Sequence, residues 1–208
     1  SYLPAVLWGV AFANIVAGVP IDASKEFTGI LFTLLNPYGL LGGLVTMTLF
    51  LTHGAMFLAL KTDGDIRHRA RALSVKLGLV AAVIAVVFIV WTLVKYDWEL
   101  VPLVLFAVAA VALLVSIFMA TQGREGWAFI GTFVTIAGAI AGLFWALFPA
   151  VMPSTTDAAY SLMASHTPDV GVSAAATQYT LKVMTWVAVI FTPVVLAFFI
   201  GTTLGVLA

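Results

Sequence analysis

The chain has 208 residues, of which 63% are hydrophobic and only 9% are charged, and its formal net charge is zero. This composition, with a mean hydropathy of +1.16, is that of an integral membrane protein and excludes a water-soluble globular domain. The charge balance offers no basic patch for nucleic acid, and the lack of cysteine in the sequence excludes disulfides, thiolate metal sites and cysteine nucleophiles.

Six apolar stretches are long enough to cross the ~30 Å hydrocarbon core of a bilayer, which takes ~20 helical residues. Backbone groups in lipid must bond within the structure, and the stretches show no two-residue alternation, so helices are predicted rather than barrel strands. The predicted fold class is therefore all-α, a polytopic transmembrane helical bundle that forms one domain over residues 1–208. The predicted spans are residues 3–19, 38–60, 77–94, 101–120, 127–148 and 179–207.

The first span is short, and neither a methionine nor a charged segment precedes it. A signal peptide is therefore not predicted, and we expect the chain to begin inside a longer protein. Pro37 at the start of the second span is typical of a first helical turn, where its missing N–H would lack a partner in any case. The sequence Asp63-Gly64-Asp65 predicts a turn after the second span. Residues 66–76 predict a short basic helix at the headgroups or at the opening of the third span.

Basic residues are concentrated in two loops. The loop at residues 61–76 and the connection between the fourth and fifth spans together contain Lys61, Arg67, Arg69, Arg71, Lys76 and Arg124. The opposite side has Lys25 and Lys95, and the loop at residues 149–178 has no lysine or arginine. Because cytoplasmic loops retain Lys and Arg, residues 61–76 are predicted to be cytoplasmic and residues 149–178 extracytoplasmic. Both ends of the chain then face the cytoplasm, and Lys182 just inside the sixth span can extend its amine outward.

Small residues recur at three- and four-residue steps on two of the spans. They are Gly39, Gly42, Gly43 and Thr46 on the second span, and Gly131, Thr135, Gly138 and Gly142 on the fifth. Such faces let the backbones of neighbouring helices approach closely, so they predict helix contacts. A ligand cavity lined by small residues is the alternative interpretation.

His53 is the central ionisable residue of the predicted spans. It lies one helical turn from Met56, so the two side chains share a face and cannot supply the two opposite axial bonds of one haem. Three roles stay open for His53: packing with a hydrogen bond to a neighbouring helix, a place in a polar network or proton pathway, and the single axial ligand of a haem.

No catalytic constellation is evident in the loops. His166, Asp157 and Asp169 belong to the loop at residues 149–178, but their spacing matches no metal signature, and His68 lies in the basic loop. Asp97 and Glu99 flank Trp98 in an outer turn, where the indole ring is typical of an interfacial anchor. The sequence contains no phosphate-binding glycine loop and no nucleophile elbow. We therefore predict no catalytic, cofactor-binding or metal-binding residue, and no enzyme that acts alone.

Three ordered segments resemble subunit II of the bacterial cytochrome bd quinol oxidases, over nearly the whole chain. They read LPAVLWGVAFANIVAGVPID, NPYGLLGGLVTMTLFLTHGAMFLALKTDGDIRHRAR and YTLKVMTWVAVIFTPVVLA. In that family subunit II has nine membrane helices and an outer N-terminus, so the six spans would be helices four to nine. The first three helices, with acidic residues implicated in proton delivery, would then be missing. The ending after Ala197 departs from the family's aromatic-rich stretch and basic tail.

The resemblance implies a multi-pass protein of the bacterial plasma (inner) membrane and a role in a respiratory quinol:oxygen oxidoreductase that reduces oxygen to water. Subunit I of that family binds two b-type haems and one d-type haem and oxidises quinol on the outer side, whereas subunit II is its non-haem partner and is not catalytic alone. His53 would then not be a haem ligand. A small accessory subunit and a structural quinone or lipid are further expected partners. A small-solute permease or a membrane scaffold subunit stays open as the alternative.

Overall fold

The computed structural model describes residues 2–95, 100–163 and 178–205. Its helices are α1 (Tyr2–Ala17), α2 (Leu31–Leu34), α3 (Pro37–Lys61), α4 (Gly64–Lys95), α5 (Leu100–Thr121), α6 (Glu125–Leu147), the 3₁₀ turn η1 (Ala158–Tyr160) and α7 (Gln178–Gly205). Two short strands, β1 (Ala150–Met152) and β2 (Leu162–Met163), complete the described elements. The predicted all-α membrane bundle is confirmed, because a helix overlaps each predicted span.

Four of the described helices, α3 to α6, are long and apolar enough to cross a membrane. Helix α1 has 16 residues, fewer than the ~20 that a perpendicular span requires. Helix α7 has 28 residues, with Pro193 inside it, and is not one of these four helices. Six spans therefore stay a prediction, while a multi-pass bundle is a finding.

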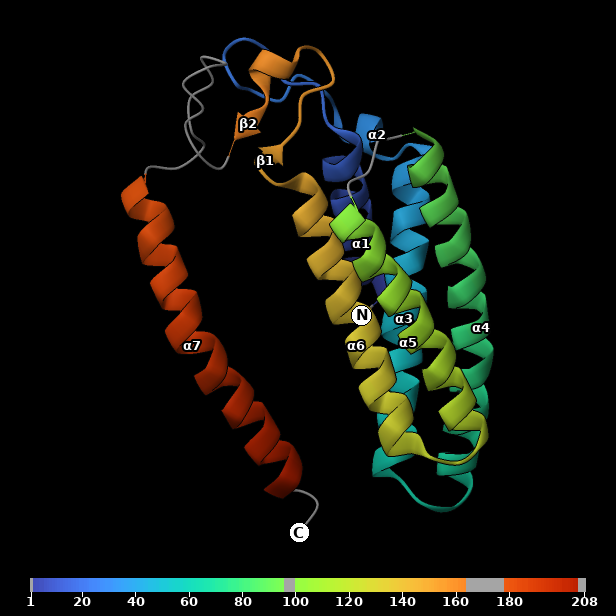
Figure 1. Cartoon of the computed structure of the whole chain (residues 1–208). Coiled ribbons are helices and arrows are strands. Elements are labelled where there is room, and N and C mark those ends of the chain that lie inside the picture. Colours follow the sequence, from blue (N-terminus) through green and yellow to red (C-terminus); the bar gives the residue numbers. More distant parts are fainter. Residues whose placement is uncertain (1, 96–99, 164–177, 206–208) are drawn as a thin grey trace.

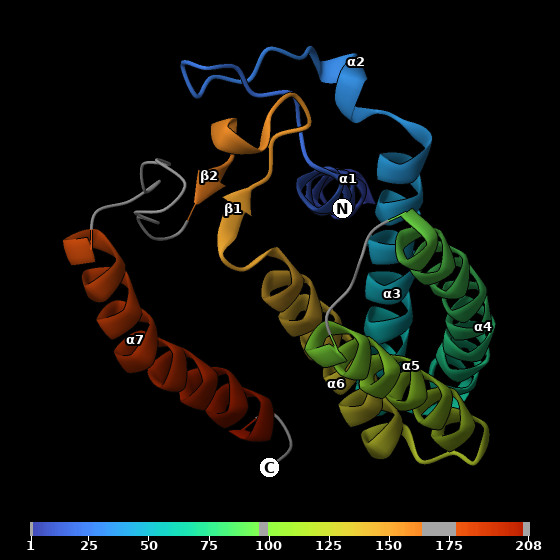
Figure 2. The same cartoon turned by 45° about the horizontal axis from the view of Figure 1, so that its top comes forward.

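Helices α3, α4, α5 and α6 run side by side, and α1 lies along α3 (Figure 1). The α3–α4 and α5–α6 connections lie at one end of the bundle, here called the inner end. The strands and the segment between α1 and α3 lie at the opposite end, here called the outer end. Helix α7 stands apart from the other helices in both views (Figure 2).

The predicted basic helix at residues 66–76 is confirmed as the opening of the third span, but the segment at residues 61–76 as a whole is not a loop. It consists of the last residue of α3, a two-residue connection at Thr62 and Asp63, and the first turns of α4. The reason is local, because residues 65–76 contain good helix formers and neither glycine nor proline. The 32 residues of α4 extend over ~48 Å at 1.5 Å per residue. The helix is thus longer than the ~30 Å hydrocarbon core, which leaves room for its basic first turns outside it.

The two small-residue faces make the predicted helix contacts. An ideal Cβ on Gly42 would lie 2.5 Å from the Cβ of Ala13 on α1, and the Thr46 hydroxyl donates to the Ala5 carbonyl at 2.8 Å. On α6, an ideal Cβ on Gly131 would lie 2.7 Å from the Cβ of Ser116 on α5. These contacts confirm that both faces serve close packing between helices.

Two asparagines connect α1 to the start of α3. The buried Asn14 donates to the Leu34 carbonyl at 2.7 Å, and Asn36 donates to the Asn14 side-chain oxygen at 2.7 Å. Asn36 also accepts from the Gly39 N–H at 2.8 Å and so caps α3 immediately before Pro37. The chain between α1 and α3 is therefore anchored at both of its ends.

Two distant segments form an ordered cap at the outer end. The Val19 N–H donates to the Pro153 carbonyl and the Thr155 N–H donates to the Val19 carbonyl, each at 3.0 Å. Ile21, within the first of these segments, is buried with 1% exposure, and the Lys25 amine donates to the Ala159 carbonyl. The described part of the predicted loop at residues 149–178 is therefore structured. His166, Asp169 and the triplet Asp97-Trp98-Glu99 lie outside the described residues.

Candidate functional site

His53 forms a hydrogen-bonded contact between two membrane helices. Its Nδ1 on α3 lies 2.7 Å from the Thr132 hydroxyl oxygen on α6. The imidazole is half-buried and stacks on the Phe129 ring, with 4.4 Å between ring centroids and 25° between planes. Both partners come from α6, three residues apart, so they share one face of that helix.

The neighbours of Thr132 indicate which imidazole nitrogen carries the proton. The Thr132 hydroxyl also lies 2.8 Å from the Phe129 carbonyl, to which it donates. A hydroxyl has one proton, so its oxygen accepts from the Nδ1–H of His53. In the neutral ring the proton on Nδ1 leaves Nε2 unprotonated.

The structure also places His53 at a defined depth. Its partner Thr132 follows Glu125, the first residue of α6, by seven positions, which is ~10 Å along the helix axis. His53 therefore lies in the membrane-spanning part of the bundle, in the half that is nearer to the inner end. The neighbouring Met56 is buried, with its sulfur 3.2 Å from the Ser116 hydroxyl on α5.

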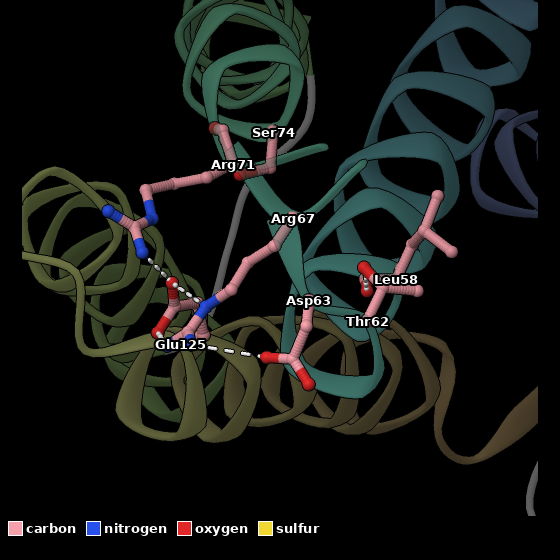
Figure 3. A network of polar contacts seen from close by, with 7 residues as sticks. All are labelled: Leu58, Thr62, Asp63, Arg67, Arg71, Ser74 and Glu125. Carbon is pink, nitrogen blue, oxygen red and sulfur yellow. Dashed lines mark hydrogen bonds and ion pairs between the residues drawn. The ribbon is translucent and has the colours of Figure 1, made fainter. Parts of the chain in front are cut away.

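A cluster of charged residues at the inner end joins α4 to α6 (Figure 3). The Glu125 side chain is 6% exposed and accepts from Arg67, with Nε 3.1 Å from Oε1 and Nη2 3.0 Å from Oε2. Arg71, one turn further along α4, donates to the same Oε1. Asp63 lies 3.7 Å from Arg67 Nη1, and its side chain is 97% exposed. Glu125 is therefore the centre of this inner charged cluster, and Asp63 lies at its edge.

The inner charged cluster holds the first turn of α6 against the first turns of α4. A two-pronged arginine–carboxylate pair fixes orientation as well as distance, because two parallel N–H···O bonds form at once. A carboxylate in the first turn of a helix is further stabilised by the positive end of the helix dipole. The sequence interpretation missed this cluster. The sequence did contain one indication of it, namely the acidic residue Glu125 at the start of a span, on the side where the arginines are concentrated.

Within residues 2–95, 100–163 and 178–205, no group of three or more His, Asp or Glu side chains could hold a metal ion. The groups that the structure brings together are thus a histidine–threonine pair inside the membrane and an ion-pair cluster at its inner end. The chemistry that these described residues offer is hydrogen bonding and charge pairing.

The fold and these two polar groups define a multi-pass helical membrane protein with an ionisable side chain inside its bundle. The model of the family described as cytochrome bd terminal oxidase subunit II matches residues 1–203. The chain therefore belongs to this family, and the resemblance stated above is confirmed.

Curated relatives from three bacteria agree with this assignment. The chain is 32% identical over 235 aligned residues to cytochrome bd-I ubiquinol oxidase subunit 2 of Escherichia coli K12, which covers 95% of the chain and 60% of the relative. It is 30% identical to the probable cytochrome oxidase subunit 2 of Haemophilus influenzae Rd, with the same coverage. It is 31% identical over 202 residues to cytochrome bd ubiquinol oxidase subunit 2 of Bacillus subtilis 168, with 94% and 57% coverage. The chain thus spans about 60% of the length of the curated relatives that it matches.

Proposed function

We propose that this chain serves as the non-haem membrane subunit of a cytochrome bd-type quinol:oxygen oxidoreductase. In this role it supports a haem-bearing subunit I that contains two b-type haems and one d-type haem, oxidises quinol and reduces oxygen to water. The observation that carries the proposal is the family match over residues 1–203. The names of the relatives, ubiquinol oxidase subunit 2, support the same assignment. A small accessory subunit completes the proposed complex.

Purification of the complex through an affinity tag on this chain tests the proposed function. We expect a second, larger membrane subunit to co-purify and the preparation to show the red absorption band of haem d. Quinol-dependent oxygen consumption should accompany that band and be missing from the isolated chain. A haem-free chain that transports a small solute into vesicles by itself would contradict the proposal and favour the permease.

A structural quinone or lipid has a candidate site in the bundle. An apolar cavity of about 490 Å³ lies among α1, α3, α4, α5 and α6, with Trp8 and Phe12 in its lining. Its two polar lining residues, Thr46 and Thr135, use their hydroxyls on the backbone carbonyls of Ala5 and Gly131. Water needs two to four polar partners, so these contacts support an apolar occupant such as an isoprenoid or acyl chain.

His53 is proposed as a member of a polar network rather than a haem ligand. We expect His53→Ala to leave the haem content and the visible spectrum of the assembled complex unchanged. Thr132→Val should lower the stability of the bundle by ~0.6 kcal/mol, a typical value for one hydrogen bond between membrane helices. The reduced–oxidised difference spectrum and calorimetric unfolding of both variants provide the measurements.

The two variants also separate the network from a proton pathway. A drop in oxygen consumption for His53→Ala, with no comparable drop for Thr132→Val, would favour the pathway. Loss of a haem band from a His53→Ala complex that still contains both subunits would contradict the proposed role and identify His53 as a ligand.

The proposed orientation places the inner end of the bundle in the cytoplasm. Six lysines and arginines belong to that end, whereas Lys25 and Lys95 belong to the outer end, which supports the positive-inside assignment. The chain has no cysteine, so single cysteines can report sidedness, and both Ser24 and His68 are exposed. We expect Ser24→Cys to react with an impermeant maleimide from outside intact spheroplasts, and His68→Cys to react only after permeabilisation. The reverse pattern would invert the topology.

A further inference from the structure

Helix α4 lies at the edge of the bundle in both views (Figure 1 and Figure 2), and its inward face has small side chains. The buried residues of this face are Ala70, Ser74, Gly78, Ala81 and Thr92. An ideal Cβ on Gly78 would lie 2.8 Å from the Cγ1 atom of Ile117 on α5. Ala81 belongs to an apolar cluster with Leu49 of α3 and Leu113 of α5. The face of α4 that contacts protein is therefore rich in small residues, as contacts between membrane helices usually are.

The opposite face of α4, here called the outward face, has a different composition. Its residues follow at alternating steps of four and three and are Arg69, Leu73, Lys76, Val80, Val83, Val87, Val90 and Val94. All eight are exposed, and the exposed fractions of the six apolar side chains run from 48% to 84%. None of them is small, and branched side chains keep a neighbouring helix backbone at a distance. The chemistry of the outward face is therefore that of a surface covered by acyl chains.

The two basic residues of the outward face have no ion pair within the described part of the chain. The ion pairs that α4 forms there involve Arg67 and Arg71, which reach α6 and the end of α3. Asp65 lies one turn before Arg69 on the same side of the helix, but no ion pair joins the two. The positive charges of Arg69 and Lys76 are therefore not neutralised by the described chain.

These two charges lie at the depth of the lipid headgroups. Lys76 is the last charged residue before residues 77–94, which contain none and extend over ~27 Å, close to the thickness of the hydrocarbon core. Arg69 lies seven positions earlier, ~10 Å nearer to the inner end. Side chains of a helix tilt toward its N-terminus, which for α4 is the inner end, so Lys76 can extend its amine toward the headgroups.

We propose that the outward face of α4 binds an anionic phospholipid of the leaflet at the inner end, with its headgroup between Arg69 and Lys76 and an acyl chain along the valines that follow. A zwitterionic lipid has no net charge and would leave both cations without a counter-charge. Another transmembrane helix would meet a row of branched side chains and no small residue. The inference requires only that the bundle lies in a membrane, and it does not depend on the proposed oxidase role.

Fluorescence quenching by brominated lipids tests this site. The protein, purified through a tag on this chain with the subunits that accompany it, is reconstituted into vesicles of equal parts phosphatidylglycerol and phosphatidylcholine. A bimane label is attached at Val83→Cys, where the native side chain is 66% exposed and lies two turns beyond Lys76. Val111→Cys is the reference, because Val111 is 60% exposed and its helix α5 has no lysine or arginine. Bromine is carried by one of the two lipids at a time, and the protein without an added cysteine gives the background.

We expect the ratio of phosphatidylglycerol to phosphatidylcholine beside residue 83 to exceed that beside residue 111 about fivefold, the preference that one basic residue near an anionic lipid supports. Equal ratios at the two positions would overturn the site. Lack of quenching by either lipid at residue 83 would show that protein covers the outward face, and this result would overturn the inference as well.

Charge variants then test the two residues. Arg69→Gln combined with Lys76→Gln should lower the ratio beside residue 83 to the value at residue 111. Arg124→Gln is the matched control, because it removes an exposed cation of the inner end that is not on α4. We expect it to leave the ratio beside residue 83 unchanged. A high ratio that persists in the double variant, or an equal fall in the control, would show that Arg69 and Lys76 do not hold the headgroup.

Discussion

Glu125→Ala is expected to destabilise the folded chain by about 2 kcal/mol and to loosen α6 from α4 at the inner end. Removing one partner of a fully buried ion pair costs about 3–5 kcal/mol, because a charge is left unpaired. Exposed pairs contribute only ~0–1 kcal/mol. Glu125 is 6% exposed, but the side chains of Arg67 and Arg71 are 38% and 26% exposed and regain water when the carboxylate is lost. The expected loss therefore lies between the two limits.

Asp63→Ala is the matched control for Glu125→Ala. Both changes remove a carboxylate near Arg67, but Asp63 is 97% exposed and 3.7 Å away. We expect calorimetric unfolding in detergent to be unchanged for Asp63→Ala and lowered for Glu125→Ala. Glu125→Gln should fall between them, because the amide retains one acceptor oxygen without the charge. Equal unfolding temperatures for Glu125→Ala and Asp63→Ala would show that the inner charged cluster contributes no more than an exposed ion pair.

The helices of the bundle were predictable from the sequence because their cause is local. Each apolar stretch must form its own backbone hydrogen bonds in lipid, so hydropathy alone located the helices. The glycines of α3 and α6 were interpretable for a similar reason, since spacing along one helix decides which side chains share a face. The outer cap was not predictable. Its bonds from Val19 to Pro153 and from Thr155 to Val19 join residues far apart in sequence, and neither segment has an unusual composition.

The candidate site, too, could be predicted only in part from the sequence. The presence of His53 in a span was visible in the sequence, but its partner Thr132 is 79 residues away. From the sequence alone, many other threonines and serines could have been the partner of His53, because the partner depends on how α3 and α6 are rotated against each other. Glu125 was missed because counting lysines and arginines per loop predicts orientation and says nothing about which arginine meets a carboxylate. That pairing depends on which arginine side chains of α4 can reach the first turn of α6 in the assembled bundle.

The contact between α1 and α3 should be the most sensitive point of the described bundle. An ideal Cβ on Gly9 would lie 2.0 Å from the Thr46 hydroxyl oxygen, 2.4 Å from the Gly42 carbonyl oxygen and 2.7 Å from the Gly43 Cα. Two of these three atoms belong to the backbone of α3, so a rotamer change cannot relieve the overlap. The helices must move apart, which also stretches the hydrogen bond from Thr46 to the Ala5 carbonyl.

Gly9→Ala is therefore expected to destabilise the bundle by about 3 kcal/mol, at the upper end of the usual cost of overpacking. Gly126→Ala is the matched control, because an ideal Cβ on Gly126 meets no atom within 4 Å. Alanine is the better helix former, so the control should unfold at an unchanged or slightly higher temperature. Calorimetry of the two variants in the same detergent gives the comparison. If Gly9→Ala unfolds no earlier than Gly126→Ala, the backbones of α1 and α3 do not pack as closely as the structure shows, because a methyl group at residue 9 can be accommodated only when the helices are further apart.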